Sequence, residues 1–167
     1  MIWLWILAGL VLATFGLVVF RGAPYVPTLR RDIKKAIDLA GVKKGECIVD
    51  LGSGDGRLLI AAAEQGIESV GYELNPLLVL ISKFRTRKYK DMVNIKTADF
   101  WRVKLPADTG AVFIFLAEPY MYKLNKYLQA EAIRLDKPVT LISYAFELPG
   151  HKPVKRDGGL IKYIVKP

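Results

Sequence analysis

Three acidic residues and three glycines stand near the middle of the chain in a pattern typical of a nucleoside-binding loop. The string Val49-Asp50-Leu51-Gly52-Ser53-Gly54-Asp55-Gly56 closes an apolar run that begins at Cys47. Glycines at alternate positions let the backbone turn tightly without side chains that would block a ligand, and the amides at the start of the next helix point toward that ligand. Seventeen residues after Gly56, Glu73 ends a second apolar run. An acid at that point accepts hydrogen bonds from ribose hydroxyls, so the spacing predicts a nucleoside-containing cofactor.

The charge around these glycines indicates which kind of nucleoside the loop binds. A dinucleotide loop has the spacing G-x-G-x-x-G and holds a pyrophosphate. Here the spacing is G-x-G-x-G, with Asp50 before the first glycine and Asp55 before the last. Two carboxylates would repel a pyrophosphate, whereas they suit a ligand that carries an ammonium and a sulfonium group.

The segment 49–56 resembles motif I of the class I, seven-β-strand S-adenosylmethionine-dependent methyltransferases, and Glu73 resembles the end of their second strand. The resemblance implies S-adenosylmethionine as cofactor, S-adenosylhomocysteine as product, and no metal. It implies that the loop lies under the methionine part of the cofactor and that two acids face the ammonium of that part. It also implies that Glu73 and Asn75 hold the ribose, and that an acid and an aromatic residue contact the adenine. The loop residues are Gly52, Ser53, Gly54 and Gly56, the two acids are Asp50 and Asp55, and the adenine residues are Asp99 and Phe100, with Trp101 beside them.

A second resemblance is more specific and covers residues 22–165. Pro24-Tyr25-Val26-Pro27-Thr28 and Gly71-Tyr72-Glu73-Leu74-Asn75-Pro76 resemble the small membrane-associated lysine methyltransferases that modify the mitochondrial ATP synthase c-subunit and the adenine nucleotide translocase. This resemblance implies methylation of a lysine Nε in a membrane protein. Two readings stay open beside it: a methyltransferase for a small or lipid-like acceptor, and a non-catalytic cofactor-binding module tethered to a membrane complex.

Transfer to lysine requires a deprotonated amine that attacks the sulfonium methyl in line, so the protein's part is mostly positioning. Burial beside a cation lowers the pKa of that amine, which makes a strong general base optional. Aromatic faces guide cationic groups, and we select Tyr25 and Tyr120, with Tyr144 behind them. Glu118 is placed to accept a hydrogen bond from the amine. For each tyrosine, ordinary packing is the alternative.

The first twenty residues contain no charge, and an apolar helix of about twenty residues spans a bilayer core. We therefore expect a single membrane anchor. Seven basic and two acidic residues lie between positions 21 and 44, which predicts that the domain stays on the cytoplasmic side, or on the matrix side of a mitochondrion. Small residues at Gly9, Ala13 and Gly16 leave a homodimer through the anchor open.

The formal net charge of +9 points to an anionic partner. A second basic cluster covers residues 83–104. For an anchored domain, attraction to anionic lipid headgroups is the simpler explanation. Binding of nucleic acid is the less favoured alternative.

The remaining pattern alternates between short apolar runs and helical segments, as in βα units. We expect an anchor over 1–20, a linker over 21–28 and one domain over 29–167. The expected fold is a doubly wound, Rossmann-like, mostly parallel seven-stranded sheet with a C-terminal antiparallel hairpin. Expected strands are 47–51, 69–73, 93–97, 111–116 and 139–144, with a hairpin of 152–156 and 160–165; expected helices are 29–40, capped by Thr28, then 57–65, 76–89 and 121–135.

Overall fold

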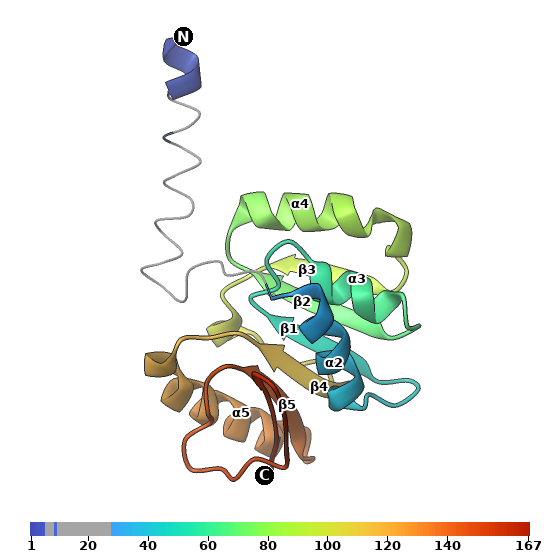
Figure 1. Cartoon of the computed structure of the whole chain (residues 1–167), viewed down its shortest axis with the longest axis vertical. Helices are drawn as coiled ribbons and strands as arrows, with labels where there is room; N and C mark the ends of the chain where they lie inside the picture. The colour runs from blue at the N-terminus through green and yellow to red at the C-terminus, as the bar shows by residue number, and fades with distance from the viewer. Residues whose placement is uncertain (6–8, 10–27) are drawn as a thin grey trace.

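The computed structural model describes residues 1–5, 9 and 28–167, which include a seven-stranded sheet with helices on both faces (Figure 1). The strand order is β3-β2-β1-β4-β5-β7-β6. Strands β1 to β5 are parallel, and β7 is antiparallel to both of its neighbours. The bounds are β1 (Cys47–Leu51), β2 (Glu68–Glu73), β3 (Val93–Thr97), β4 (Thr109–Ile114), β5 (Val139–Tyr144), β6 (Lys155–Asp157) and β7 (Leu160–Val165). The predicted mostly parallel sheet with a C-terminal antiparallel hairpin is confirmed.

Four α-helices cover the sheet within residues 28–167. Three of them pack on one face and one packs on the other (Figure 1). Because successive side chains of a strand point to opposite faces, Ile48 lies in the core under the three helices, while Val49 lies in the core under the single helix. The first group is α2 (Arg30–Ala40), α3 (Arg57–Ala63) and α4 (Pro76–Thr86), and the single helix is α5 (Met121–Leu135).

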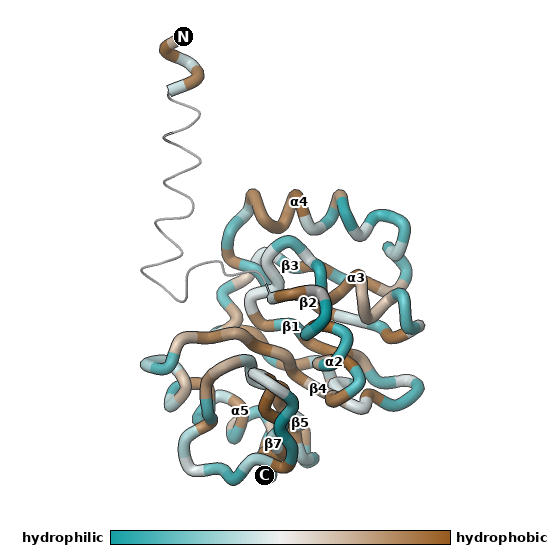
Figure 2. Tube along the Cα trace, in the orientation of Figure 1, coloured by the Kyte–Doolittle hydropathy of each residue, from teal (hydrophilic) through white to brown (hydrophobic). Residues whose placement is uncertain are grey.

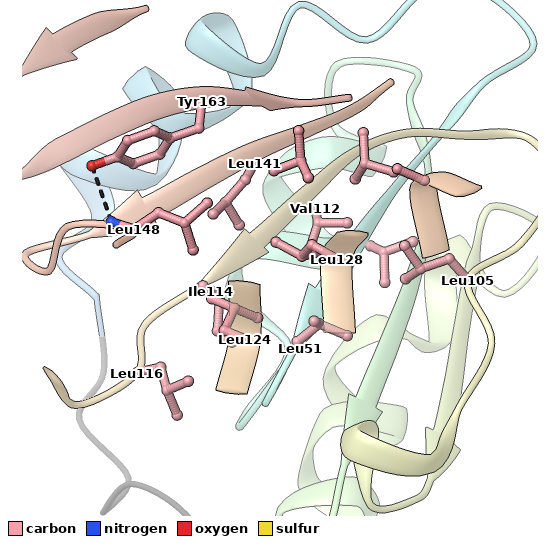
Figure 3. Packing of buried hydrophobic residues seen from close by; sticks show 14 of the residues in the cluster. Leu51, Leu105, Val112, Ile114, Leu116, Leu124, Leu128, Leu141, Leu148 and Tyr163 are labelled. Carbon is pink, nitrogen blue, oxygen red and sulfur yellow. Dashed lines mark hydrogen bonds between the residues drawn. The ribbon is translucent and has the colours of Figure 1, made fainter. Parts of the chain in front are cut away.

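The core on the α5 side is built from leucine and valine side chains of β1, β4, β5 and α5 (Figure 3). Tyr163 of β7 is fully buried in it, and its hydroxyl accepts a hydrogen bond from the backbone amide of Leu148 (3.1 Å). This bond satisfies the one polar atom of a large buried side chain. It also fixes the loop after β5 against the C-terminal strand.

Apart from the two-residue turn between β6 and β7, two connections between strands lack an α-helix. Residues 98–108, between β3 and β4, contain only the short 3₁₀ helix η2 (Phe100–Arg102), and residues 145–154 join β5 to β6 without a helix. On the face of the sheet that α5 covers, the part beside β3 is therefore covered by side chains of this first loop. Two further 3₁₀ turns are η1 (Arg87–Tyr89), which extends α4, and η3 (Glu118–Tyr120), which leads into α5.

Several boundaries differ from the prediction, among them the start of β2 at Glu68 and the limits of β6 at Lys155–Asp157. Strand β4 spans 109–114 rather than 111–116, because it pairs along β1 from Thr109 onward and its last apolar residues leave the sheet. Helix α3 ends at Ala63, and the segment predicted as helix 76–89 ends as a 3₁₀ turn. Thr28 does not cap α2. The helix starts one residue later, and Leu29 takes the capping position without a side-chain hydrogen bond.

No helix in the part of the chain that the structure describes has the length and apolar character needed to cross a bilayer. Most of the predicted anchor 1–20 and nearly all of the linker 21–28 lie outside the described residues.

Candidate active site

The glycine-rich bend joins the end of β1 to the start of α3 at the carboxyl edge of the sheet. The backbone of Gly52 has φ 87°, in the left-handed region that favours glycine. The amides of Gly52 and Ser53 donate to the carbonyl of Tyr72 in β2 (2.8 and 3.0 Å), which ties the bend to the neighbouring strand. A Cβ added to Gly52 would meet no atom within 4 Å. The bend thus presents bare backbone to open space, where a ligand can approach.

Gly56 has a different role, because its open side faces helix α4. It has φ 78°, and a Cβ at this position would collide with the hydroxyl oxygen of Ser82. Ser53 also turns inward: it is buried, and its hydroxyl lies against Gly71 of β2. The hydroxyls of Ser53 and Ser82 are buried and have no hydrogen-bond partner among the described residues. Gly56 therefore allows α4 to pack closely on the bend.

Asp50 lies in β1 just before the bend and is only 5% exposed. Its carboxyl accepts no hydrogen bond from residues 28–167. Burial, together with the nearby charges of Glu73 and Asp55, raises the pKa of Asp50 to about 8. A buried carboxylate without a partner is unfavourable. The position is therefore suited to a ligand that brings a positive charge.

Glu73 connects the bend to the start of α4. One carboxylate oxygen accepts a hydrogen bond from the amide of Gly54 (2.9 Å), and the other accepts from the amide of Asn75 (2.7 Å). A carboxylate has about four acceptor positions, so the side chain keeps capacity for two further donors, as a ribose would supply. Asn75 caps α4 by accepting from the amides of Leu77 and Leu78. The side-chain nitrogen of Asn75 is buried and has no partner among the described residues.

The carboxylate of Asp55, predicted to face a cofactor ammonium, is held by two arginine side chains. Its carboxylate accepts two hydrogen bonds from Arg57 (both 2.9 Å) and another from Arg85. Burial would raise the pKa of Asp55, but the two guanidinium groups outweigh it and hold the pKa below its usual value. Arg57 also donates to the carbonyl of Thr28 (3.0 Å), which brings the segment before α2 to the bend. Both arginines already neutralise this charge, and the contact of Asp55 with a cofactor ammonium stays a prediction.

The loop after β3 carries Asp99 and Phe100. The amide of Ala98 donates to the carbonyl of Glu73 (3.0 Å), so this loop begins beside the tip of β2. Asp99 accepts from the amide of Trp101 (3.1 Å), and its side chain remains 32% exposed. The rings of Phe100 and Trp101 lie 4.5 Å apart between centroids and are half-buried against the α5-side core. Both rings thus pack against the α5-side core, in the loop that begins beside the tip of β2.

The residues predicted to contact the methyl acceptor come from segments outside the glycine-rich bend. Glu118 is exposed in η3, which follows β4, and Tyr120 is half-buried against the α5-side core. Tyr144 donates its hydroxyl to the carboxylate of Asp32 in α2 (3.0 Å), so it holds two elements together. Tyr25 lies outside the described residues.

The sequence matches the model of one known family, the ANTKMT methyltransferase domain, over residues 50–155. The chain belongs to this family.

Relatives of this ANTKMT-family protein include the ATP synthase c-subunit lysine N-methyltransferase of Xenopus laevis. It is 37% identical over 134 residues, which are 78% of this chain and 56% of that relative, so the chain spans about half of its length. A protein-lysine N-methyltransferase of Saccharolobus islandicus is 27% identical over 85% of this chain and 90% of its own length.

Among solved structures, an RNA methyltransferase of Salinibacter ruber in complex with S-adenosyl-L-homocysteine aligns with a TM-score of 0.72. It shares 24% sequence identity, and the alignment covers 84% of this chain and 94% of that one. At this identity the likeness supports the fold alone.

Sequence reasoning missed Arg57, Arg85 and Thr28 as neighbours of the bend in this family member. Arg57 is two residues from Asp55, but Arg85 is thirty residues away on another helix, and no local pattern links it to the bend. Asp55 is paired with two arginines, so Asp50 and Glu73 are the acidic residues at the bend that have no arginine partner among the described residues. Their positions relative to the glycines had indicated both as candidate cofactor residues.

Proposed function

We propose that this protein is an S-adenosylmethionine-dependent protein-lysine methyltransferase that acts on a membrane protein. The observation that carries the proposal is Asp50, a buried carboxyl without a hydrogen-bond partner among the described residues, next to the open backbone of Gly52. The bend lies where the strand order reverses between β1 and β4, and open α/β sheets bind their ligands at this point. The family assignment supports methyl transfer as the reaction.

Four described residues at the carboxyl edge each have a chemical counterpart in the proposed cofactor. The free acceptor capacity of Glu73 suits the ribose hydroxyls, and Asp50 suits the ammonium of the methionine part. The carboxylate of Asp99 suits the amino group of adenine, and the ring of Phe100 suits its ring face. When bound, the cofactor supplies an electrophilic methyl group on a sulfonium.

The protein's contribution to transfer is to orient the lysine amine and to favour its neutral form. Burial beside a cation disfavours an ammonium, so the lysine loses its proton more readily in the site than in water. Glu118 and Tyr120 in η3 are the described candidates for contacting the amine, together with Tyr25 from the linker. An exposed loop after β4 lets a large acceptor reach the cofactor.

Three features support a lysine on a membrane protein. A relative of nearly the same length is named a protein-lysine N-methyltransferase, and the Xenopus relative is named for the c-subunit of ATP synthase. The uncharged segment 1–20 fits a single-pass anchor, and the basic residues after it fit a domain on the cytoplasmic or matrix side. Contact with anionic lipids fits the net charge of +9.

The test is to incubate the purified full-length protein with radiolabelled S-adenosylmethionine and solubilised membranes, and to separate the protein, lipid and RNA fractions. We expect label in a protein band, and mass spectrometry should place the added methyl on a lysine. Glu73→Ala, which removes the ribose acceptor, should abolish labelling. Label in the lipid or RNA fraction would contradict the lysine assignment, and cofactor binding without transfer to any fraction would contradict catalysis.

The role of residues 1–20 has a separate test. Their deletion should leave cofactor affinity unchanged, because the bend lies far from them in sequence, and should slow methylation of a membrane-embedded acceptor. Equal rates for both forms on such an acceptor would contradict the anchoring role.

A further inference from the structure

Helix α4 differs from an ordinary surface helix because large apolar side chains lie on its exposed side. Such a helix buries its large apolar residues and exposes its polar ones. In α4 the exposed side includes Leu80 (65% exposed), Phe84 (66%) and Ile81 (38%). The buried side includes the small polar residues Ser82 and Thr86 together with Leu78 and Val79. The colouring of the helix in Figure 2 shows the hydrophobic residues along α4 at the margin of the molecule.

The close packing at Gly56 explains why the buried side is small. Ser82 lies directly against the bare Cα of Gly56, and the hydroxyl of Thr86 donates to the carbonyl of Ser82 (2.9 Å). A larger apolar residue at position 82 would push α4 off the cofactor-binding bend. The larger apolar residues of α4 at 80, 81 and 84 consequently face outward.

Positive charge surrounds the exposed apolar side chains. Residues 76–90 contain five basic residues and no acidic one. Arg85 is paired with Asp55, and the other four, Lys83, Arg87, Lys88 and Lys90, are exposed. The guanidinium of Arg87 lies over the ring of Phe84 at 4.3 Å, and it donates to the carbonyl of Phe84 (2.9 Å). The long stems of Lys and Arg let their charges reach headgroups while their carbons stay on apolar surface.

We propose that the outer face of α4, formed by Leu80, Ile81 and Phe84 with Lys83, Arg87 and Lys88, lies in the interface of an anionic lipid bilayer. Apolar side chains that enter the acyl boundary, flanked by lysine and arginine that meet anionic headgroups, are the two features of an in-plane membrane helix. The uniform positive charge makes a second copy of this face a poor partner for it. The inference extends the membrane contact under the proposed function by naming the surface.

This contact would orient the cofactor site. The N-terminal end of α4 is capped by Asn75, which bonds to Glu73 at the carboxyl edge of the sheet. With α4 in the membrane plane, that edge opens sideways along the bilayer surface. The acceptor would then be a lysine held near the headgroups rather than one that projects far from the membrane.

A fluorescent probe at position 84 tests the contact in the full-length protein. Cys47 is the only cysteine, and it is buried, with a thiol pKa raised by that burial to about 11, so a cysteine introduced at the surface can be labelled selectively. Phe84→Cys carries an environment-sensitive nitrobenzoxadiazole probe. Ile133→Cys on α5 is the matched control, because Ile133 is 65% exposed and Phe84 is 66% exposed. The protein is reconstituted into nanodiscs of phosphatidylcholine with one quarter phosphatidylglycerol, and into nanodiscs of phosphatidylcholine alone.

The expected result is a several-fold brighter, blue-shifted probe at position 84 in the anionic nanodiscs, quenched by nitroxide-labelled lipid, with position 133 unchanged. Lys83→Gln with Lys88→Gln should weaken the response at 84. Lys43→Gln with Lys44→Gln, the same charge change in an exposed loop before β1, should not.

Three outcomes would overturn the inference: a probe at 84 that stays in water, equal responses at 84 and 133, and a response without lipid that grows with protein concentration. The last would indicate a second copy of the chain. Because the readout needs no methyl transfer, it succeeds or fails separately from the proposed function.

Discussion

Replacing Asp50 by asparagine tests the electrostatic reasoning about the site. Asp50 in the unliganded protein has a pKa raised to about 8, chiefly by burial. A cofactor ammonium beside it favours the ionised carboxylate. Binding should therefore release a proton below pH 8, and cofactor affinity should rise with pH until the free protein is ionised. Asparagine keeps the shape and cannot ionise.

The size of the effect follows from the fraction of free protein that carries the ionised form. With a pKa of about 8, that fraction is about one in a hundred at pH 6 and about one half at pH 8. If the pKa in the complex falls below about 5, the affinity contributed by Asp50 should increase about fifty-fold between these two values. This corresponds to about 2.3 kcal/mol of binding free energy.

Isothermal titration calorimetry with S-adenosylmethionine from pH 6 to pH 9 measures the effect. The amine of the cofactor titrates near pH 8, as free α-amino groups do, and this contribution is the same for both proteins. The informative quantity is therefore the ratio of the dissociation constant of Asp50→Asn to that of the native protein. A ratio that does not change with pH would refute the assignment of Asp50 to the cofactor ammonium.

The same raised pKa makes a prediction about stability without cofactor. A carboxyl whose pKa is higher in the folded than in the unfolded state contributes stability that is complete below about pH 4 and is lost as the pH rises toward 8. The difference in Tm between Asp50→Asn and the native protein should therefore grow in favour of the variant over this range, as scanning calorimetry can measure. A difference that is constant with pH would contradict the buried position of this charge.

Three further variants test other parts of the site. Glu73→Ala should weaken cofactor binding at least a hundred-fold by calorimetry. It should also lower the free energy of unfolding by about 1–3 kcal/mol, since two backbone amides lose their acceptor. Unchanged affinity would remove the assignment of Glu73 to the ribose. Gly56→Ala should destabilise the fold by about 2 kcal/mol in urea unfolding, because φ at this position is positive and the new Cβ meets Ser82. Adding Ser82→Gly should recover part of the lost stability, and no recovery would contradict the contact between positions 56 and 82. Asp55→Asn should lower stability while changing cofactor affinity less than tenfold, because two arginines already hold this charge; a larger loss of affinity would return Asp55 to the cofactor.

The parts of the fold predicted well are those that local sequence determines. Strands 47–51 and 139–144 coincide with the observed bounds, since each is an apolar run bounded by residues that end a strand. Strand β4 was misplaced by two residues because its limits depend on pairing with β1, which apolar character does not reveal.

The same distinction applies to the site. The bend and Glu73 were recognised because glycine spacing and strand length fix their geometry within one βα unit. The pairing of Asp55 with Arg85 could not be recognised, because it depends on how α4 packs against the start of α3. The outward apolar face of α4 was also missed, since Leu77–Ile81 reads as a run of buried residues until the packing of Ser82 is known.

The place of β7 determines when during synthesis the domain can be completed. This strand is the last regular element of the chain, yet it is inserted between β5 and β6 and holds the fully buried Tyr163. Its Lys162 also bonds to the carbonyl of Leu39 in α2, 123 residues earlier. A nascent chain that stops before residue 160 leaves one long edge of β5 unpaired and the end of α2 unsupported. Residues 160–165 must therefore leave the ribosome before the native packing of this sheet is reached.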